Sequence, residues 1–251
     1  MSGEIFQKNF SRDGFAIVQG LCDLPTLNKM RTIAQRDLVP LTYPAEFEAD
    51  LGYPGAPESR HSKGGHTVRR LLSACDRDDC FFQWAISPIL KPYLQNLLDS
   101  RRVCMSRVHH NCLMTKHPGY SSATLWHRDI RYWEFDHPEL ISVWLALGKE
   151  EAKNGALKMI PGSHNYSLSE SRLDDELFLR TDLTANRKLI DESVVIELEP
   201  GDVVFFSCNV LHAAEKNLSD EIKFSLVTTY HAGGNKPIPD TRSATLPSVL
   251  M

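Results

Sequence analysis

A histidine and an aspartate two positions apart, followed much later by a lone histidine, constrain the fold of this chain more than any other feature. His127 and Asp129 stand in the segment Leu125-Trp-His-Arg-Asp129, and His212 comes eighty-five positions after the first histidine. Because successive side chains of a strand point to opposite faces, residues 127 and 129 are expected on one face of a strand. A fold that uses all three together must bring distant strands side by side.

The three side chains together supply two imidazoles and one carboxylate. That set is the facial triad of non-haem iron(II) oxygenases, which leaves three coordination positions open for substrate and dioxygen. The alternative for His127 and Asp129 is a structural hydrogen-bonded pair, and for His212 a solvent-exposed strand end. The neighbouring His109 and His110 point to opposite faces of a strand and are expected not to be ligands. The segments that flank the triad favour the metal site.

Those flanking segments follow strand and turn patterns. Apolar runs at 140–147 and 156–160 lie on either side of Asn154-Gly155, a dipeptide typical of hairpins. Pro200-Gly201-Asp202 predicts a turn. The β-branched and aromatic run at 203–206 predicts a buried strand that leads to the second histidine. These spacings predict a β-sandwich in which neighbouring strands bring the triad together.

The order and spacing of five motifs resembles the phytanoyl-CoA dioxygenase family of iron(II)- and 2-oxoglutarate-dependent oxygenases. The motifs are H-x-D, a tyrosine three residues on, V-W-x-A-L, N-G-A-L-x-x-I-P-G-S-H and G-D-V-V-F-F…H, and they cover roughly residues 100 to 231. The resemblance implies an all-β core with flanking helices, folded as a double-stranded β-helix (jelly roll). It also implies that His127, Asp129 and His212 are the iron ligands and that Trp144 lies beside the 2-oxoglutarate pocket.

One position departs from the family's pattern. The family usually places an arginine about eleven residues after the distal histidine, where it grips the far carboxylate of 2-oxoglutarate, and here that residue is Lys223. Lysine lacks arginine's bidentate fork but still neutralises a carboxylate, and Ser225 on the same strand face adds a hydroxyl donor. Lys223, Ser225 and Trp144 are thus the candidate co-substrate contacts, although Lys223 is alternatively an ordinary surface lysine. The candidate substrate contacts are Arg70, Arg131 and Tyr132.

The resemblance implies an enzyme that hydroxylates a small organic molecule. Its cofactor would be Fe(II), its co-substrate 2-oxoglutarate and its oxidant dioxygen, with succinate and CO2 released. Two alternatives stay open: a jelly-roll metal enzyme that does not use 2-oxoglutarate, and a non-catalytic binding module. The sequence contains no nucleophile elbow, phosphate-binding loop or dinucleotide fingerprint that would indicate other chemistry.

The length of the chain and the positions of its glycines and prolines predict one domain over residues 1–251. We expect a helical N-terminal part at 1–100 with a long loop at 41–66, and a jelly-roll core at 101–233 with a polar insertion at 165–193. The expected helices span residues 3–12, a segment that begins at Pro25, and residues 81–98 with interruptions at Pro88 and Pro92. The tail beyond residue 233 is expected to be irregular.

Composition excludes some partners. The formal net charge of −4 argues against nucleic-acid binding through bulk electrostatics, and no stretch approaches the ~20 apolar residues that span a bilayer. The N-terminus shows no secretory signal pattern. Cys104, Cys112 and Cys208 lie in apolar strand patterns and are expected to be buried thiols. These features predict a cytoplasmic protein without nucleic-acid or membrane partners.

Overall fold

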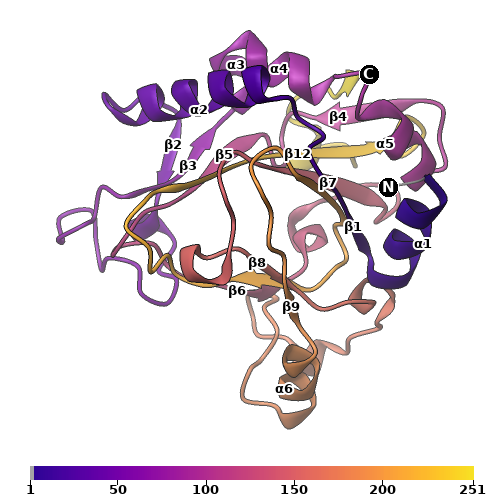
Figure 1. Ribbon diagram of the computed structural model, residues 1–251. Helices are drawn as coiled ribbons and strands as arrows, with labels where there is room; N and C mark the ends of the chain where they lie inside the picture. Colours follow the sequence, from indigo (N-terminus) through magenta and orange to yellow (C-terminus); the bar gives the residue numbers. More distant parts are fainter. Residues whose placement is uncertain (1–2) are drawn as a thin grey trace.

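Two antiparallel β-sheets packed face to face form the centre of the molecule (Figure 1). The computed structural model describes residues 3–251. The larger sheet has nine strands and the smaller has four, and helices cover the outer face of the larger one. This is the jelly roll with flanking helices that the sequence predicts, and the space between the sheets is where a site would lie.

The larger sheet runs in the order β1-β10-β7-β12-β5-β3-β2, with β4 paired to β12 and β13 paired to β4. Its strands are β1 (Phe15–Val18), β2 (Ala45–Phe47), β3 (Val68–Leu72), β4 (Val103–Ser106), β5 (Cys112–Lys116), β7 (Leu140–Ala146), β10 (Val203–Ser207), β12 (Lys223–Ala232) and β13 (Val249–Leu250). The smaller sheet runs in the order β6-β11-β8-β9. Its strands are β6 (Thr124–His127), β8 (Leu157–Met159), β9 (Val194–Val195) and β11 (His212–Ala214).

The helices lie mainly outside the larger sheet, where Figure 1 shows α2, α3 and α4 above it. The α-helices are α1 (Gly3–Asp13), α2 (Leu24–Leu38), α3 (Ala74–Arg77), α4 (Asp79–Ala85), α5 (Lys91–Leu97) and α6 (Thr184–Asp191). The 3-10 helices are η1 (Glu48–Asp50), η2 (Asp129–Tyr132), η3 (Ala152–Asn154), η4 (Ser163–Asn165), η5 (Glu170–Arg172) and η6 (Arg242–Ala244). Pro25 lies in the first turn of α2, as the sequence predicts, and Asp23 caps this helix by accepting the backbone N–H of Thr26.

Strand β12 shows how the larger sheet divides the core into two layers. Phe224 and Leu226 are buried beneath the helices, whereas Val227 packs between the two sheets beside Trp144. Successive side chains alternate between these faces, so Lys223 lies on the inner face as well. The central strands are therefore buried on both sides.

The predicted hairpin at Asn154-Gly155 is wrong. The two apolar runs that flank it form β7 and β8, which belong to different sheets. The dipeptide instead ends η3, and Gly155 adopts a φ of 78° as the chain crosses from the larger sheet to the smaller. Both runs are apolar because both face the interior, and that pattern does not distinguish one sheet from two.

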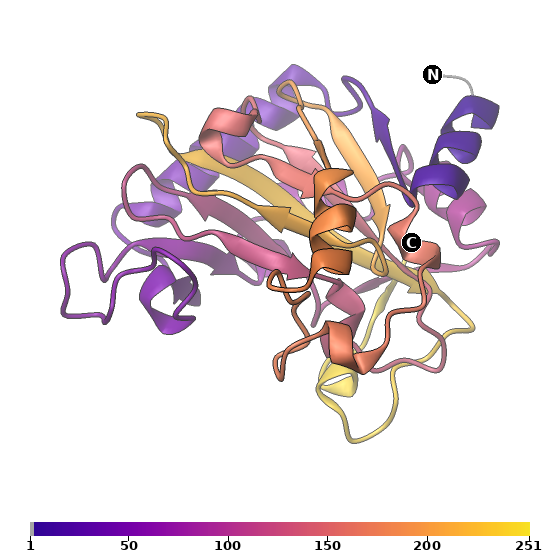
Figure 2. The ribbon, with the colours of Figure 1, turned by 90° about the horizontal axis from the view of Figure 1, so that it is seen from below.

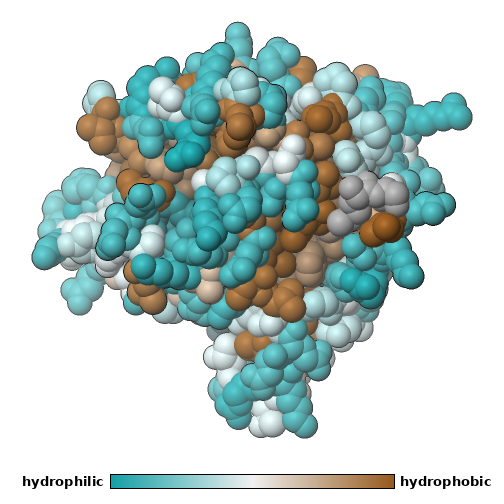
Figure 3. Space-filling view, viewed as in Figure 1, coloured by the Kyte–Doolittle hydropathy of each residue, from teal (hydrophilic) through white to brown (hydrophobic). Residues whose placement is uncertain are grey.

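Several local boundaries also differ from expectation. The expected loop at 41–66 contains strand β2 and helix η1, and the expected irregular tail contributes β13. Pro92 does not interrupt a helix but lies in the first turn of α5, where its missing N–H costs nothing. The polar insertion at 165–193 contains α6, which lies in front of the smaller sheet when the molecule is seen from below (Figure 2). The part of the surface around this helix is largely hydrophilic (Figure 3).

The state of the cysteines and the character of the helices can be compared with what composition predicts. Cys112 and Cys208 are buried as expected, whereas Cys104 is only partly buried. All six thiols are free. Within residues 3–251, no helix combines the length and apolar character that a membrane crossing requires.

Candidate metal centre

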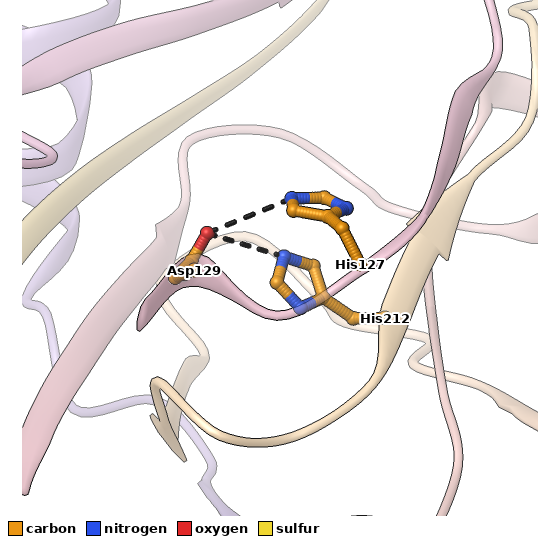
Figure 4. A group of neighbouring side chains, drawn as sticks. All are labelled: His127, Asp129 and His212. Carbon is orange, nitrogen blue, oxygen red and sulfur yellow. Dashed lines mark ion pairs between the residues drawn. The ribbon is translucent and has the colours of Figure 1, made fainter. Parts of the chain in front are cut away.

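The three residues of the expected triad meet at the adjoining ends of β6 and β11. These strands pair antiparallel, with His127 directly opposite His212. Strand β6 ends at His127, so Asp129 does not share the strand as expected but begins η2. Its carboxylate still points at both imidazoles (Figure 4): Asp129 Oδ1 lies 3.6 Å from Nε2 of each histidine. The structure therefore brings the triad together by a strand pair and a turn.

Hydrogen bonds fix which imidazole nitrogen faces the centre. His127 Nδ1 lies 2.8 Å from the backbone oxygen of Leu125, and His212 Nδ1 lies 3.0 Å from that of Val210. A carbonyl oxygen only accepts, so each Nδ1 carries the hydrogen and donates it. The unprotonated Nε2 of each ring is then left to face Asp129, which is the arrangement usual for histidines that bind a metal.

Burial and neighbouring charges set the protonation states of His127 and Asp129. Burial, reinforced by the nearby His212, lowers the pKa of His127 to about 4. Burial by itself would raise the pKa of Asp129, but His110, His212 and His127 outweigh it and hold that pKa below its usual range. His110 Nδ1 lies 3.5 Å and the Ser142 hydroxyl 3.4 Å from Asp129 Oδ2. At neutral pH His127 is thus a neutral imidazole and Asp129 an ionised carboxylate, the states that metal ligands require.

The donor set fits a divalent first-row metal ion. The three ligand atoms lie within 4.8 Å of one another, and no other group of three or more His, Cys, Asp or Glu residues in the described part of the chain is so arranged. Two imidazole nitrogens and one carboxylate oxygen are the donors of the facial triad.

A cavity of about 480 Å³ between the sheets has the triad in its wall. The other expected residues that line it are Arg70, Arg131, Tyr132, Trp144 and Lys223. Arg70 is paired with Glu46 of β2 at 2.8 Å. Ser225 is fully buried and does not line the cavity; its hydroxyl lies behind Lys223 instead. Eight of the nine candidate residues named from the sequence therefore line the cavity, but the sequence did not indicate how its charges are paired.

Lys223 is not a surface lysine, since it is 5% exposed and its charge is already matched. Its ammonium donates to Glu150 Oε2 at 2.9 Å and to the Ser225 hydroxyl at 3.1 Å. Ser225 and the Trp144 indole N–H donate to Glu150 Oε1 at 2.6 and 2.8 Å. Glu150 is fully buried. This counter-ion could not be recognised from the sequence, because it stands in the run Lys149-Glu-Glu151, which resembles a solvated turn.

Lys116 is a second buried lysine that sequence reasoning missed. It lies opposite Lys223 in the register of β5 and β12 and lines the same cavity. Its ammonium donates to the backbone oxygens of Ser122 at 2.8 Å and Glu215 at 2.5 Å. Burial, with repulsion from Arg69 and Lys223, lowers the pKa of Lys116 to about 7. The sequence did indicate that Lys116 is buried, because strand alternation places it on the same face as the apolar residues Cys112 and Met114.

The insertion at 165–193 reaches the triad through Phe178. This buried ring meets the His127 imidazole edge to face, with centroids 5.9 Å apart. The Arg131 guanidinium lies 3.6 Å from the centre of the Phe178 ring and 4.3 Å from that of the half-exposed Tyr132. The insertion thus covers one side of the metal centre and holds Arg131 at the cavity.

Comparisons with known proteins agree with this architecture. The sequence model of the family described as Phytanoyl-CoA dioxygenase (PhyH) matches residues 10–225. Phytanoyl-CoA dioxygenase 1 of Oryza sativa subsp. japonica is 27% identical over 146 residues, which are 56% of this chain and 52% of that protein. The chain spans about half the length of the first curated relatives that it matches.

Solved structures show the same fold at low sequence identity. EctD from S. alaskensis with 2-oxoglutarate and 5-hydroxyectoine has a TM-score of 0.72 at 20% identity, covering 95% of this chain and 78% of that one. The non-heme alpha ketoglutarate dependent epimerase SnoN from nogalamycin biosynthesis has a TM-score of 0.74 at 20% identity, covering 94% and 85%. The jelly roll is therefore shared over nearly the whole chain.

Proposed function

Because the chain belongs to the phytanoyl-CoA dioxygenase family, we propose that it is an iron(II)- and 2-oxoglutarate-dependent oxygenase. It would hydroxylate a small organic molecule and release succinate and CO2. The observation that carries this proposal is the triad of His127, Asp129 and His212 in the wall of a cavity between the sheets. Its donors and protonation states suit ferrous iron.

The chain's own part is to hold the ligands and to limit access of water. We assign the metal positions to Nε2 of His127, Nε2 of His212 and a carboxylate oxygen of Asp129. When bound, ferrous iron and 2-oxoglutarate supply the oxidising chemistry, in which dioxygen is consumed as the oxo acid is decarboxylated. The carbonyls of Leu125 and Val210 orient the two imidazoles, which fixes the ligand geometry before any ion arrives.

The remaining cavity residues are proposed ligand contacts. A volume of about 480 Å³ suits a co-substrate together with a small molecule. We propose that Trp144 borders the co-substrate and that Arg70, Arg131 and Tyr132 contact the substrate, since all four line the cavity. We also propose a cytoplasmic location, which the free thiols support because disulfides are rare there.

The test is 2-oxoglutarate turnover. Protein incubated with ferrous salt, 2-oxoglutarate and dioxygen is expected to release succinate, and the Asp129→Ala variant is expected not to. The rival is a jelly-roll metal protein that does not use 2-oxoglutarate, and the neutralised Lys223 is the observation in its favour. Oxygen consumption without 2-oxoglutarate would support a different metal enzyme, and iron binding without succinate release would support a binding module.

A further inference from the structure

Two buried lysines lie on the inner face of the larger sheet, and only one of them is paired with a buried carboxylate. Lys223 forms its ion pair with Glu150, while Lys116 lies opposite Lys223 and faces the same side. In the described part of the chain, no carboxylate lies within ion-pair distance of the Lys116 ammonium, which bonds to the backbone oxygens of Ser122 and Glu215. This strand pair therefore holds one positive charge without a counter-ion.

An uncompensated buried charge is costly, and the protein shows that cost. Burial is the largest cause of the lowered pKa of Lys116, so its charged form is disfavoured. An ammonium has three N–H donors, and two of them are used by backbone oxygens. A single carboxylate from a ligand would supply both the missing charge and the missing acceptor.

The position of Lys116 suits an acid that is held at the triad by its other end. The Lys116 ammonium bonds to the backbone of Glu215, which follows the end of β11 and lies three residues after His212. At ~3.3 Å per residue this is about 10 Å of chain. Both Lys116 and His212 line the same cavity, so one elongated ligand could contact both ends.

We propose that Lys116 holds the distal carboxylate of the 2-oxoglutarate co-substrate and that Lys223 balances Glu150. This inference rests on the proposed function. Glu150 also accepts hydrogen bonds from Trp144 and Ser225. If Lys223 bound a ligand instead, the buried Glu150 carboxylate would lose its counter-ion, which is strongly unfavourable. Because Glu150 keeps Lys223 in its ion pair, Lys116 is the lysine that can bind the ligand's carboxylate.

The experiment compares two oxo acids on the full chain loaded with manganese(II), so that no turnover is needed. One is 2-oxoglutarate, and the other is 2-oxopentanoate, which has the same chain length but a methyl group in place of the distal carboxylate. Dissociation constants are measured by titration calorimetry. Wild-type protein is expected to prefer 2-oxoglutarate at least tenfold. The Lys116→Gln variant should lose that preference while its affinity for 2-oxopentanoate stays within about twofold, and glutamine keeps an N–H donor for the backbone oxygens.

Two further variants separate the roles of the lysines. The double variant Lys223→Met/Glu150→Leu removes a charge pair together and should retain the preference, as should Lys149→Gln at an exposed lysine. Because the double variant changes a packed cluster, Glu150→Gln is measured as well and should keep or increase the preference. Retention of the preference by Lys116→Gln, or its loss in the double variant with 2-oxopentanoate binding intact, would overturn the assignment.

The same titrations keep this inference distinct from the proposed function. Wild-type protein that binds manganese but neither oxo acid would contradict the proposed function itself. Wild-type protein that binds both oxo acids equally would contradict the anchor at Lys116 while leaving oxo-acid use in place. A loss of binding of both acids in Lys116→Gln alone would show that the residue supports the cavity and does not select the carboxylate.

Discussion

His127 and His212 face each other across the β6–β11 pair with their ring centroids 4.2 Å apart. At that distance each positive charge would repel the other, which contributes to the lowered pKa of His127. The strand register alone creates this proximity. A slip of one residue would turn one imidazole to the opposite face of the sheet, so the position of the metal centre is set by backbone pairing.

Replacing any ligand of the triad should strongly weaken metal binding without unfolding the chain. We expect His127→Ala, Asp129→Ala and His212→Ala each to weaken iron(II) binding at least a hundredfold, ~2.8 kcal/mol. The far-ultraviolet circular dichroism should be unchanged, because the cores lie on either side of the larger sheet. His61→Ala, at an exposed loop histidine, is the matched control. Tight iron binding by any one of the three variants would remove that residue from the ligand set.

Gly155→Ala should destabilise the protein more than the same change at another left-handed glycine. An added Cβ at residue 155 would lie 2.5 Å from the Glu215 backbone oxygen and 2.7 Å from Lys116 Cδ, whereas one at Gly119 meets nothing within 4 Å. Both glycines have φ near 75–78°, so both substitutions carry a strain of ~1 kcal/mol. Thermal unfolding should show the larger loss for Gly155→Ala, together with a reduced preference for 2-oxoglutarate. Equal losses of thermal stability in the two variants would mean that the segment around residue 155 accommodates the methyl group.

The pH dependence of stability should reveal the buried ammonium of Lys116. Burial is the main cause that lowers its pKa from 10.5 to about 7, with Arg69 and Lys223 acting in the same direction and Glu48 and Glu215 against it. Between these two values the unfolded chain binds the proton more than the folded chain does, so folding becomes more favourable as pH rises from about 7 to 10.5. The slope is at most about 1.4 kcal/mol per pH unit.

Urea unfolding of wild type and Lys116→Gln at several pH values measures this contribution. The unfolding free energy of the wild type should rise relative to the variant across the window, and the other titrations should cancel in the difference. The affinity for 2-oxoglutarate should show the opposite trend and fall as pH rises above about 7, because the ligand needs the protonated amine. Parallel stability profiles for the two proteins would show that Lys116 keeps its proton throughout.

Phe178→Ala should loosen the insertion over the metal centre. The ring is 2% exposed and packs against His127 and Arg131, so its removal should cost about 3 kcal/mol. Hydrogen exchange should become faster across residues 165–193, and co-substrate binding should slow exchange there in the wild type. Leu177→Ala, at a neighbouring side chain that is 43% exposed, should change the exchange little. Unaltered exchange in Phe178→Ala would show that other contacts hold the segment.

Sequence patterns were informative where side chains repeat or carry a motif. Strand patterns and the H-x-D motif predicted a β-sandwich that brings His127, Asp129 and His212 together, because burial and ligation both restrict residue type. The jelly roll itself was implied by the family resemblance. The patterns failed at the crossing near Asn154, where local turn chemistry is the same whether the next strand joins one sheet or the other. They also failed at α6, whose polar residues resemble a loop.

The ion pairs in the cavity could not be predicted from the sequence, for a different reason. Glu150 and Lys223 are seventy-three positions apart and meet only through the sheet register. A single sequence gives the position of each charge along the chain but not its partner in space. Lys223 was therefore expected to contact the co-substrate, with no counter-ion of its own. Trp144, expected beside the co-substrate pocket, lines the cavity.

The smaller sheet has a consequence for how long the folded chain survives. Its strands β6, β8, β9 and β11 are only 4, 3, 2 and 3 residues long, and strands this short hold one another weakly. An ion shared by β6 and β11 would bind the native state alone and add ~2.7 kcal/mol of stability at a free concentration one hundred times its dissociation constant. Metal supply would then determine the lifetime of this protein, because scarcity would loosen its weakest sheet and expose the apo form to proteolysis.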